Sequence, residues 1–233
     1  MRTPSVAAVI ATLALASVPV AARVAQPAIA RTLTRTAIID RLALPDEQPL
    51  RRYRARRHLV AATRGGRLKA ELDAWTTLEG GRFTFEVISE SGSSLIRRRV
   101  LLAALEAEQS SQTADTRDQA ALTEANYEFF ALSAAPDRLV KLDMKPRRRH
   151  VMLVEGSLFF DEESADLMRI EGELSKRPSF WTRKVHVVRE YQRIGGVHVP
   201  VAMRSTADVL VTGESTFSMT YEYAEINGQP IAR

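Results

Sequence analysis

The sequence contains no cysteine among its 233 residues. Disulfide bonds are therefore excluded, and the fold must draw its stability from an ordinary apolar core. A chain without cysteine also cannot be acylated on an N-terminal cysteine, so we do not expect it to be a lipoprotein itself. The length is enough for one large domain or two small ones.

The motifs of common enzyme classes are missing as well. The sequence has no G-x-S-x-G elbow, no P-loop, no G-x-G-x-x-G and no H-E-x-x-H. Four scattered histidines lack the spacing of metal ligands: His58, His150, His186 and His198. Glu171 and Glu173 fall on one face of a predicted strand, where Arg169 makes them a solvated charge ladder. We predict a protein that is not an enzyme and uses no cofactor or metal, with an unrecognised hydrolase as the less favoured alternative.

A concentrated excess of one charge is also lacking. The formal net charge is +5, from 33 basic and 28 acidic residues, and 28 of the basic residues are arginines. Nucleic-acid-binding proteins usually show a concentrated basic patch. The densest basic runs are residues 51–58 and 145–150, which we interpret as solvated faces or edges. We therefore expect no nucleic-acid partner.

The N-terminus has the order of a secretory signal peptide. Arg2 precedes an apolar run over residues 6–18, and small residues follow it. The run is shorter than the roughly 20 residues of a membrane-spanning helix. We predict cleavage after Ala22, with Ala30 as the second choice and an uncleaved anchor as the alternative. The mature chain, residues 23–233, is then one soluble domain in the bacterial periplasm, with no transmembrane segment.

The remaining chain alternates apolar and polar residues between paired glycines, the pattern of an antiparallel meander. One clear helix interrupts it at residues 95–108, where Ile96, Val100, Ala103 and Ala104 should form the apolar face, with Leu101 and Leu105 beside it. A short helix is expected at residues 31–44. The predicted strands are 51–62, 68–77, 83–87, 126–134, 138–145, 151–160, 167–176, 182–193, 197–207, 208–211 and 216–226.

This pattern predicts a mainly β (α+β) fold, with one large curved antiparallel sheet that forms an unclosed barrel under a helical lid. A transmembrane barrel also alternates, but dense arginine and glutamate on the polar faces favour a sheet in water. Large or open barrels leave a cavity, and we expect a ligand cavity here. The alternative is that the helix fills this space as part of an ordinary apolar core. The candidate ligand-contacting residues are Arg57, Trp75, Phe83, Phe85, Phe129, Ile170, Phe180, Trp181, Met203, Phe217, Met219 and Tyr221.

Arg57 interrupts the apolar side of its predicted strand. An inward charge guards some edge strands against pairing. The functional alternative is a guanidinium at the cavity mouth that pairs with a helix carboxylate or a ligand head group. Phe180 and Trp181 end a polar connection, and we expect them at the cavity rim against the helix or a ligand, or in simple core packing at a strand start.

The order of these elements resembles the periplasmic outer-membrane lipoprotein-sorting carriers of the LolA/LolB-like superfamily. The residues that carry the resemblance are "YRARRHLVAATRGGRLKAEL", "FTFEVISESGSSLIRRRVLLAALEAE", "VEGSLFFDEESADLMRIEGELSKRPSFW", "YQRIGGVHVPVAMRS" and "GESTFSMTYEYAEING". The resemblance implies a half-barrel that holds the acyl chain of a lipid or lipoprotein, with transient protein donors or acceptors at the envelope. The alternative on the same scaffold is an envelope sensor or regulatory module that binds a partner by edge pairing.

Overall fold

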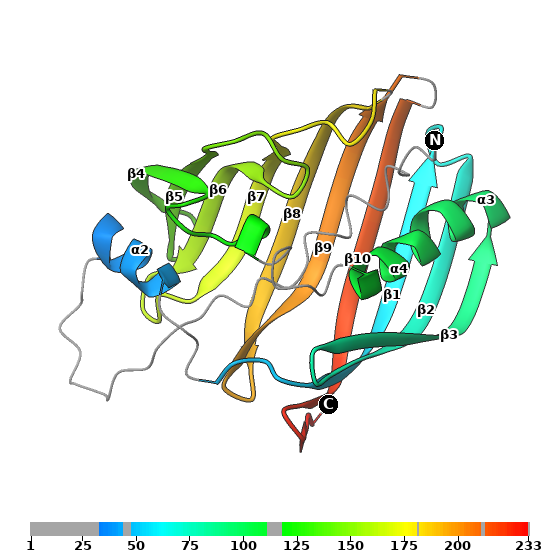
Figure 1. The fold of residues 1–233 in the computed structure, drawn as a ribbon, viewed down its shortest axis with the longest axis horizontal. Coiled ribbons are helices and arrows are strands. Elements are labelled where there is room, and N and C mark those ends of the chain that lie inside the picture. The colour runs from blue at the N-terminus through cyan, green and yellow to red at the C-terminus, as the bar shows by residue number, and fades with distance from the viewer. Residues whose placement is uncertain (1–32, 44–47, 111–117, 181, 211–212, 233) are drawn as a thin grey trace.

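The computed structural model describes residues 33–43, 48–110, 118–180, 182–210 and 213–232 (Figure 1). The predicted signal peptide and both predicted cleavage positions lie outside these ranges. The elements are α2 (Arg35–Ala43), β1 (Tyr53–Thr63), β2 (Leu68–Glu79), β3 (Arg82–Gly92), α3 (Ser94–Ile96), the π-helix η1 (Arg97–Leu102), α4 (Ala103–Ser110), β4 (Tyr127–Ala135), β5 (Leu139–Pro146), β6 (Val154–Asp161), β7 (Leu167–Leu174), β8 (Thr182–Ile194), β9 (Val197–Val209), β10 (Gly213–Ile226) and β11 (Gln229–Pro230).

All eleven strands belong to one antiparallel sheet, in the order β3-β2-β1-β10-β9-β8-β7-β6-β5-β4, with β11 paired to β10. The first strand, β1, pairs with β10, a strand near the C-terminal end of the described chain. The path ends at β3 and β4, which do not pair with each other, so the barrel is not closed (Figure 1). The predicted mainly β fold with one large open sheet is confirmed.

Strand alternation accounts for most element bounds. In β1 every second side chain is buried from Tyr53 to Ala61, as a strand with one solvated face requires. The predicted break at residues 207–208 is wrong, because β9 runs unbroken to Val209 and pairs there with Gly213. The short β11 has only two residues and carries no alternation that could predict it.

The helical insertion is one continuous segment, 94–110, formed by α3, η1 and α4, which we call the helical lid. Its buried side chains are Ile96, Leu101, Ala104, Leu105 and Glu108. Ile96 and Ala104 of the expected face are buried, but the face is shifted by about one residue toward the flanking Leu101 and Leu105, since Val100 and Ala103 are only partly buried. The π-helical turn η1 explains the shift, since its wider turn takes one extra residue before the chain returns to the same face.

Two apolar cores lie on the sheet. The helical lid covers β1, β2 and β3 and shares the first core with β8, β9 and β10 (Figure 1). The second core joins α2 to β4, β5, β6 and β7. Leu174 packs against both cores and marks their boundary. Within the described ranges, no helix is long and apolar enough to cross a membrane.

Candidate functional site

The central feature of the first core is a buried ion pair between the sheet and the helical lid. Arg57 lies on β1, opposite Ala74 of β2 and Tyr221 of β10. Because β1 has a neighbour on each side, the edge-guard interpretation of Arg57 is wrong. Arg57 does pair with a helix carboxylate, that of Glu108 of α4, but it is fully buried and therefore does not lie at a cavity mouth as the alternative expected.

The pair is bidentate and dry. Arg57 Nη1 donates to Glu108 Oε2 at 2.5 Å, and Nη2 donates to Oε1 at 2.9 Å. Nη2 also donates to the hydroxyl of Tyr53 at 2.6 Å. The exposed fraction is 0% for Arg57 and 4% for Glu108. A parallel two-bond geometry of this kind is the strongest form of an arginine–carboxylate contact.

Aromatic rings enclose the guanidinium. The Arg57 carbon Cζ lies 4.5 Å from the ring centroid of Tyr221 and 4.9 Å from that of Phe83. Its Nε has no hydrogen-bond partner among the described residues. Ring faces therefore supply part of the stabilisation that water gives to an exposed cation.

Burial and charge act in opposite directions on this cluster. Burial is the largest single effect and lowers the pKa of Arg57, but the charge and hydrogen bonds of Glu108 together with the neighbouring tyrosines raise that pKa well above its ordinary value. Burial raises the pKa of the Tyr53 phenol, although Arg57 opposes the rise. Arg57 is thus a permanent cation and Tyr53 a neutral phenol at any physiological pH.

A second arginine, Arg189 of β8, is buried on the same face and lies 5.5 Å from the Tyr191 ring. Burial is the largest single effect and lowers the pKa of Arg189, but its interactions with Tyr191, Tyr221 and Glu108 together raise that pKa above its ordinary value. Sequence reasoning missed Arg189 and the identity of Glu108. A signal existed for Arg189, because it interrupts the apolar alternation of β8 in the way that Arg57 interrupts β1.

The structure brings half of the predicted ligand-contacting residues together around this pair. Phe83, Met203, Phe217, Met219 and Tyr221 belong to the first core. Phe85 packs against that core while half-buried. Phe129 and Ile170 belong to the second core, so they do not share a site with the others.

Two predicted residues do not lie on the inner face, and a third lies outside the described residues. Trp75 points to the opposite face of β2, where Arg54 lies 4.5 Å above its ring, because its neighbours Ala74 and Thr76 take the inner positions. Phe180 is 84% exposed, which excludes the predicted packing in the core. Trp181 lies outside the described residues.

The inner face is closed to solvent around Arg57. Met203, Phe217 and Met219 are all at least nine-tenths buried. A surface pocket of about 340 Å³ lies elsewhere, beside the β10–β11 turn, and is lined by Gln48, Pro49, Arg51, Arg52 and Asn227. In the described part of the chain, no three acidic or histidine side chains gather where they could hold a metal ion. The first core can take an apolar ligand only if the helical lid moves.

Comparison with known proteins leaves the family open. No family description matches the chain, and no curated protein sequence matches it either. Among solved structures, the chain is similar to a DUF1329 family protein from Desulfovibrio piger, with 11% sequence identity and a TM-score of 0.34. That likeness covers 74% of this chain and 84% of the other. At this TM-score it carries no argument about function.

Proposed function

We propose that the protein is a periplasmic carrier that binds the acyl chain of a lipid or lipoprotein between its helical lid and the sheet, without catalysis. The observation that carries the proposal is the dry Arg57–Glu108 pair, which ties the lid to the strand beneath it. In this proposal the lid leaves the sheet when an acyl chain enters, and the first core becomes the acyl site.

A buried ion pair suits a lid that has to open. Removing two charges from water costs several kcal/mol per ion, and the attraction between them roughly offsets that cost. An all-apolar contact of the same size would hold the lid more firmly at no such cost. The π-helical turn η1 lies in the same segment, and π turns frequently mark functional sites.

The energy of an acyl chain is large enough to displace the lid. Each buried CH₂ group contributes about 0.8 kcal/mol, so a long chain contributes on the order of 10 kcal/mol. Met203 and Met219 belong to the same core as the buried side chains of the lid, and methionine adapts readily to irregular apolar partners. The face under the lid can therefore exchange helix side chains for a flexible chain.

The test is native mass spectrometry with lipid extraction on protein exported to a bacterial periplasm. We expect one acyl lipid bound to a fraction of the wild-type molecules. Glu108→Gln weakens the pair and should change that fraction severalfold, in parallel with its binding of a fluorescent long-chain fatty acid. Glu106→Gln is the matched control, because Glu106 lies on the exposed face of the same helix.

The proposal fails if the wild type carries no lipid and neither protein binds the fatty acid. The second candidate is a regulatory module that binds a partner strand, and β3 favours it. This edge strand exposes Val87 and Ile88, with exposed fractions of 37% and 47%. Edge strands with exposed apolar residues invite pairing. A stoichiometric partner protein that co-purifies with lipid-free chain would support this candidate.

A further inference from the structure

The strand connections at the two ends of the sheet differ in charge. Antiparallel order places the β1–β2, β5–β6, β7–β8 and β9–β10 connections at one end, which we call the basic end. These connections contain seven basic residues and no acidic residue: Arg64, Arg67, Arg147, Arg148, Arg149, Lys176 and Arg177.

The connections at the opposite end are acidic or neutral. They join β2 to β3, β4 to β5, β6 to β7, β8 to β9, and β10 to β11. Together they contain four acidic residues and one arginine: Asp137, Arg138, Glu162, Glu163 and Asp166. The basic residues of the connections are therefore concentrated at one end, although Arg51 and Arg52 precede β1 at the opposite end and Glu124 lies beside Arg147 at the basic end.

Hydrogen bonds join two of the basic connections into one surface. The Ser175 amide donates to the Leu153 carbonyl at 2.8 Å, and the His150 amide donates to the Ser175 hydroxyl at 3.0 Å. Arg148 and Lys176 lie close enough to His150 to reinforce the lowering of its pKa, which burial begins. The β5–β6 and β7–β8 connections thus present their cations side by side.

Three of these cationic side chains are exposed and take no part in ion pairs among the described residues. Arg149, Lys176 and Arg177 are exposed and form no ion pair with the described residues. By contrast, Arg183 and Lys184 at the start of β8 pair with acidic residues of neighbouring strands. An unpaired cluster of cations attracts an anionic surface.

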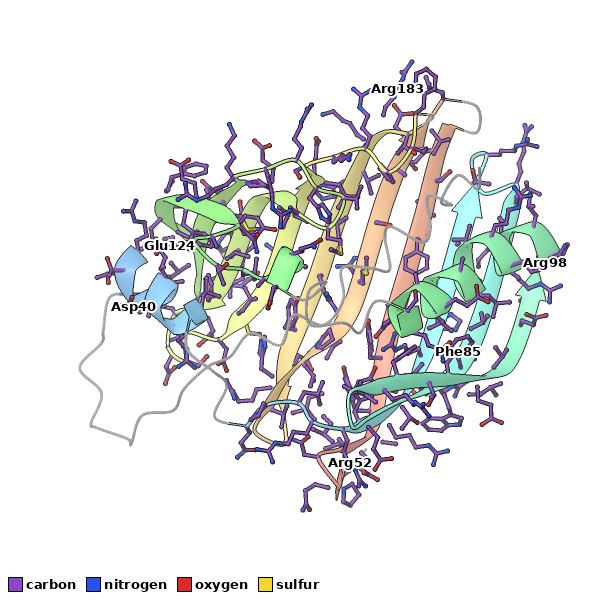
Figure 2. All side chains as sticks on the ribbon, viewed as in Figure 1. Asp40, Arg52, Phe85, Arg98, Glu124 and Arg183 are labelled. Carbon is purple, nitrogen blue, oxygen red and sulfur yellow. The ribbon has the colours of Figure 1, made fainter. Side chains whose placement is uncertain are left out.

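Large apolar side chains project beside these cations. Phe180 is 84% exposed and Leu210 is 47% exposed. They flank one register position of the sheet, the Thr182–Val209 pair, so they lie at the same corner. Figure 2 places the labelled Arg183 at this end, beyond the tips of the central strands. Cations around a protruding aromatic ring match the headgroup region of a bilayer, where charge and apolar surface are both accommodated.

We propose that the basic end docks on the surface of an anionic phospholipid bilayer, with Arg149, Lys176 and Arg177 against the headgroups and Phe180 in the interface. A nucleic acid would also attract the cations, but the aliphatic Leu210 beside Phe180 favours a lipid surface. The proposal concerns the outside of the fold and does not require an acyl chain under the lid.

The test is vesicle flotation of the purified protein, with the same N-terminus in every variant. Vesicles of equal phosphatidylcholine and phosphatidylglycerol should bind the wild type, and phosphatidylcholine alone should bind it far more weakly. Each cation near an anionic surface is worth about a factor of five. Lys176→Gln/Arg177→Gln should therefore reduce the partition coefficient by about 25-fold at low salt, and Phe180→Ser should reduce the binding that persists at 0.5 M salt.

Matched controls separate the basic end from general charge. Arg82→Gln/Arg138→Gln removes two exposed cations at the opposite end, and Phe130→Ser removes another exposed phenylalanine. Both controls should bind like the wild type. Equal losses in the two charge variants would overturn the proposal. The proposal would also be overturned if the wild type did not bind anionic vesicles, whether or not it bound an oligonucleotide or an acidic protein. A lipid-free protein that still docks would refute the carrier function alone.

Discussion

The Arg57 guanidinium of β1 and the Glu108 carboxylate of α4 form two hydrogen bonds, of 2.5 Å and 2.9 Å, across 51 residues of sequence. Both side chains are almost completely buried, with exposed fractions of 0% and 4%. The pair connects the lid to a strand in the interior of the sheet. The strength of this ion pair therefore contributes to how firmly the lid is held on the sheet.

Breaking the pair from one side should destabilise the protein strongly. Glu108→Leu leaves Arg57 as an uncompensated buried cation, so we expect the free energy of unfolding to fall by about 3–5 kcal/mol. The double variant Arg57→Leu/Glu108→Leu removes both charges and should recover most of that loss. Urea denaturation followed by circular dichroism measures both values.

The control for this prediction is Glu106→Leu, two residues away on the opposite, exposed side of the lid. A surface substitution of this kind should stay within about 0.5 kcal/mol of the wild type. If the double variant is as unstable as Glu108→Leu, then apolar packing and not charge pairing holds the lid.

Stability should fall as the pH drops through the range of histidine. His198 of β9 is buried against Tyr191, with ring centroids 5.1 Å apart, and its Nε2 contacts the Leu167 carbonyl at 2.5 Å. Burial lowers the pKa of His198 below its ordinary value of 6.5, although Asp166 opposes the change, and Arg193 and Arg41 reinforce it. Just below pH 6.5, His198 is therefore protonated in the unfolded chain but remains neutral in the folded chain.

The sign follows directly from that difference in bound protons. The contribution of His198 is fully present above about pH 7.5 and is lost as the pH falls through 6.5, with a slope of about 1 kcal/mol per pH unit. His198→Gln keeps a donor for the carbonyl and should flatten this slope. Urea midpoints at pH 8, 6.5 and 5.5 test it. Equal slopes in the two proteins would contradict the prediction, and burial of His150 would then account for the whole effect.

Two glycines allow β6 and β7 to approach closely. Gly156 and Gly172 are register partners, and a Cβ atom on Gly156 would lie 2.1 Å from the Glu171 carbonyl oxygen. Gly156→Ala forces the two backbones apart and should cost about 1–3 kcal/mol in urea denaturation. Glu155→Ala on the same strand is the control and should hardly change the free energy of unfolding. Similar losses of stability in both variants would show that the close approach of the two backbones does not matter.

Local patterns were enough to predict the sheet. Alternation and paired glycines encode strands and turns within ten or so residues, so the bounds of β1 and β2 follow closely from residues 51–62 and 68–77. The apolar face of the lid was predicted with a shift of about one residue, because a regular 3.6-residue period cannot anticipate the π turn at residues 97–102.

Long-range pairing was left to the tertiary structure. The sequence alone determined that Arg57 shares a side of its strand with apolar residues, and that the chain forms one antiparallel sheet with a helical insertion. Only the fold decided that β1 is interior, that Glu108 reaches Arg57, and that Trp75 and Phe180 face away from the core. Alternation in a sequence shows that a strand has two faces. It does not show which face is buried where both neighbouring positions carry apolar residues, or where the residue lies in a turn. That choice depends on contacts between segments far apart in the chain.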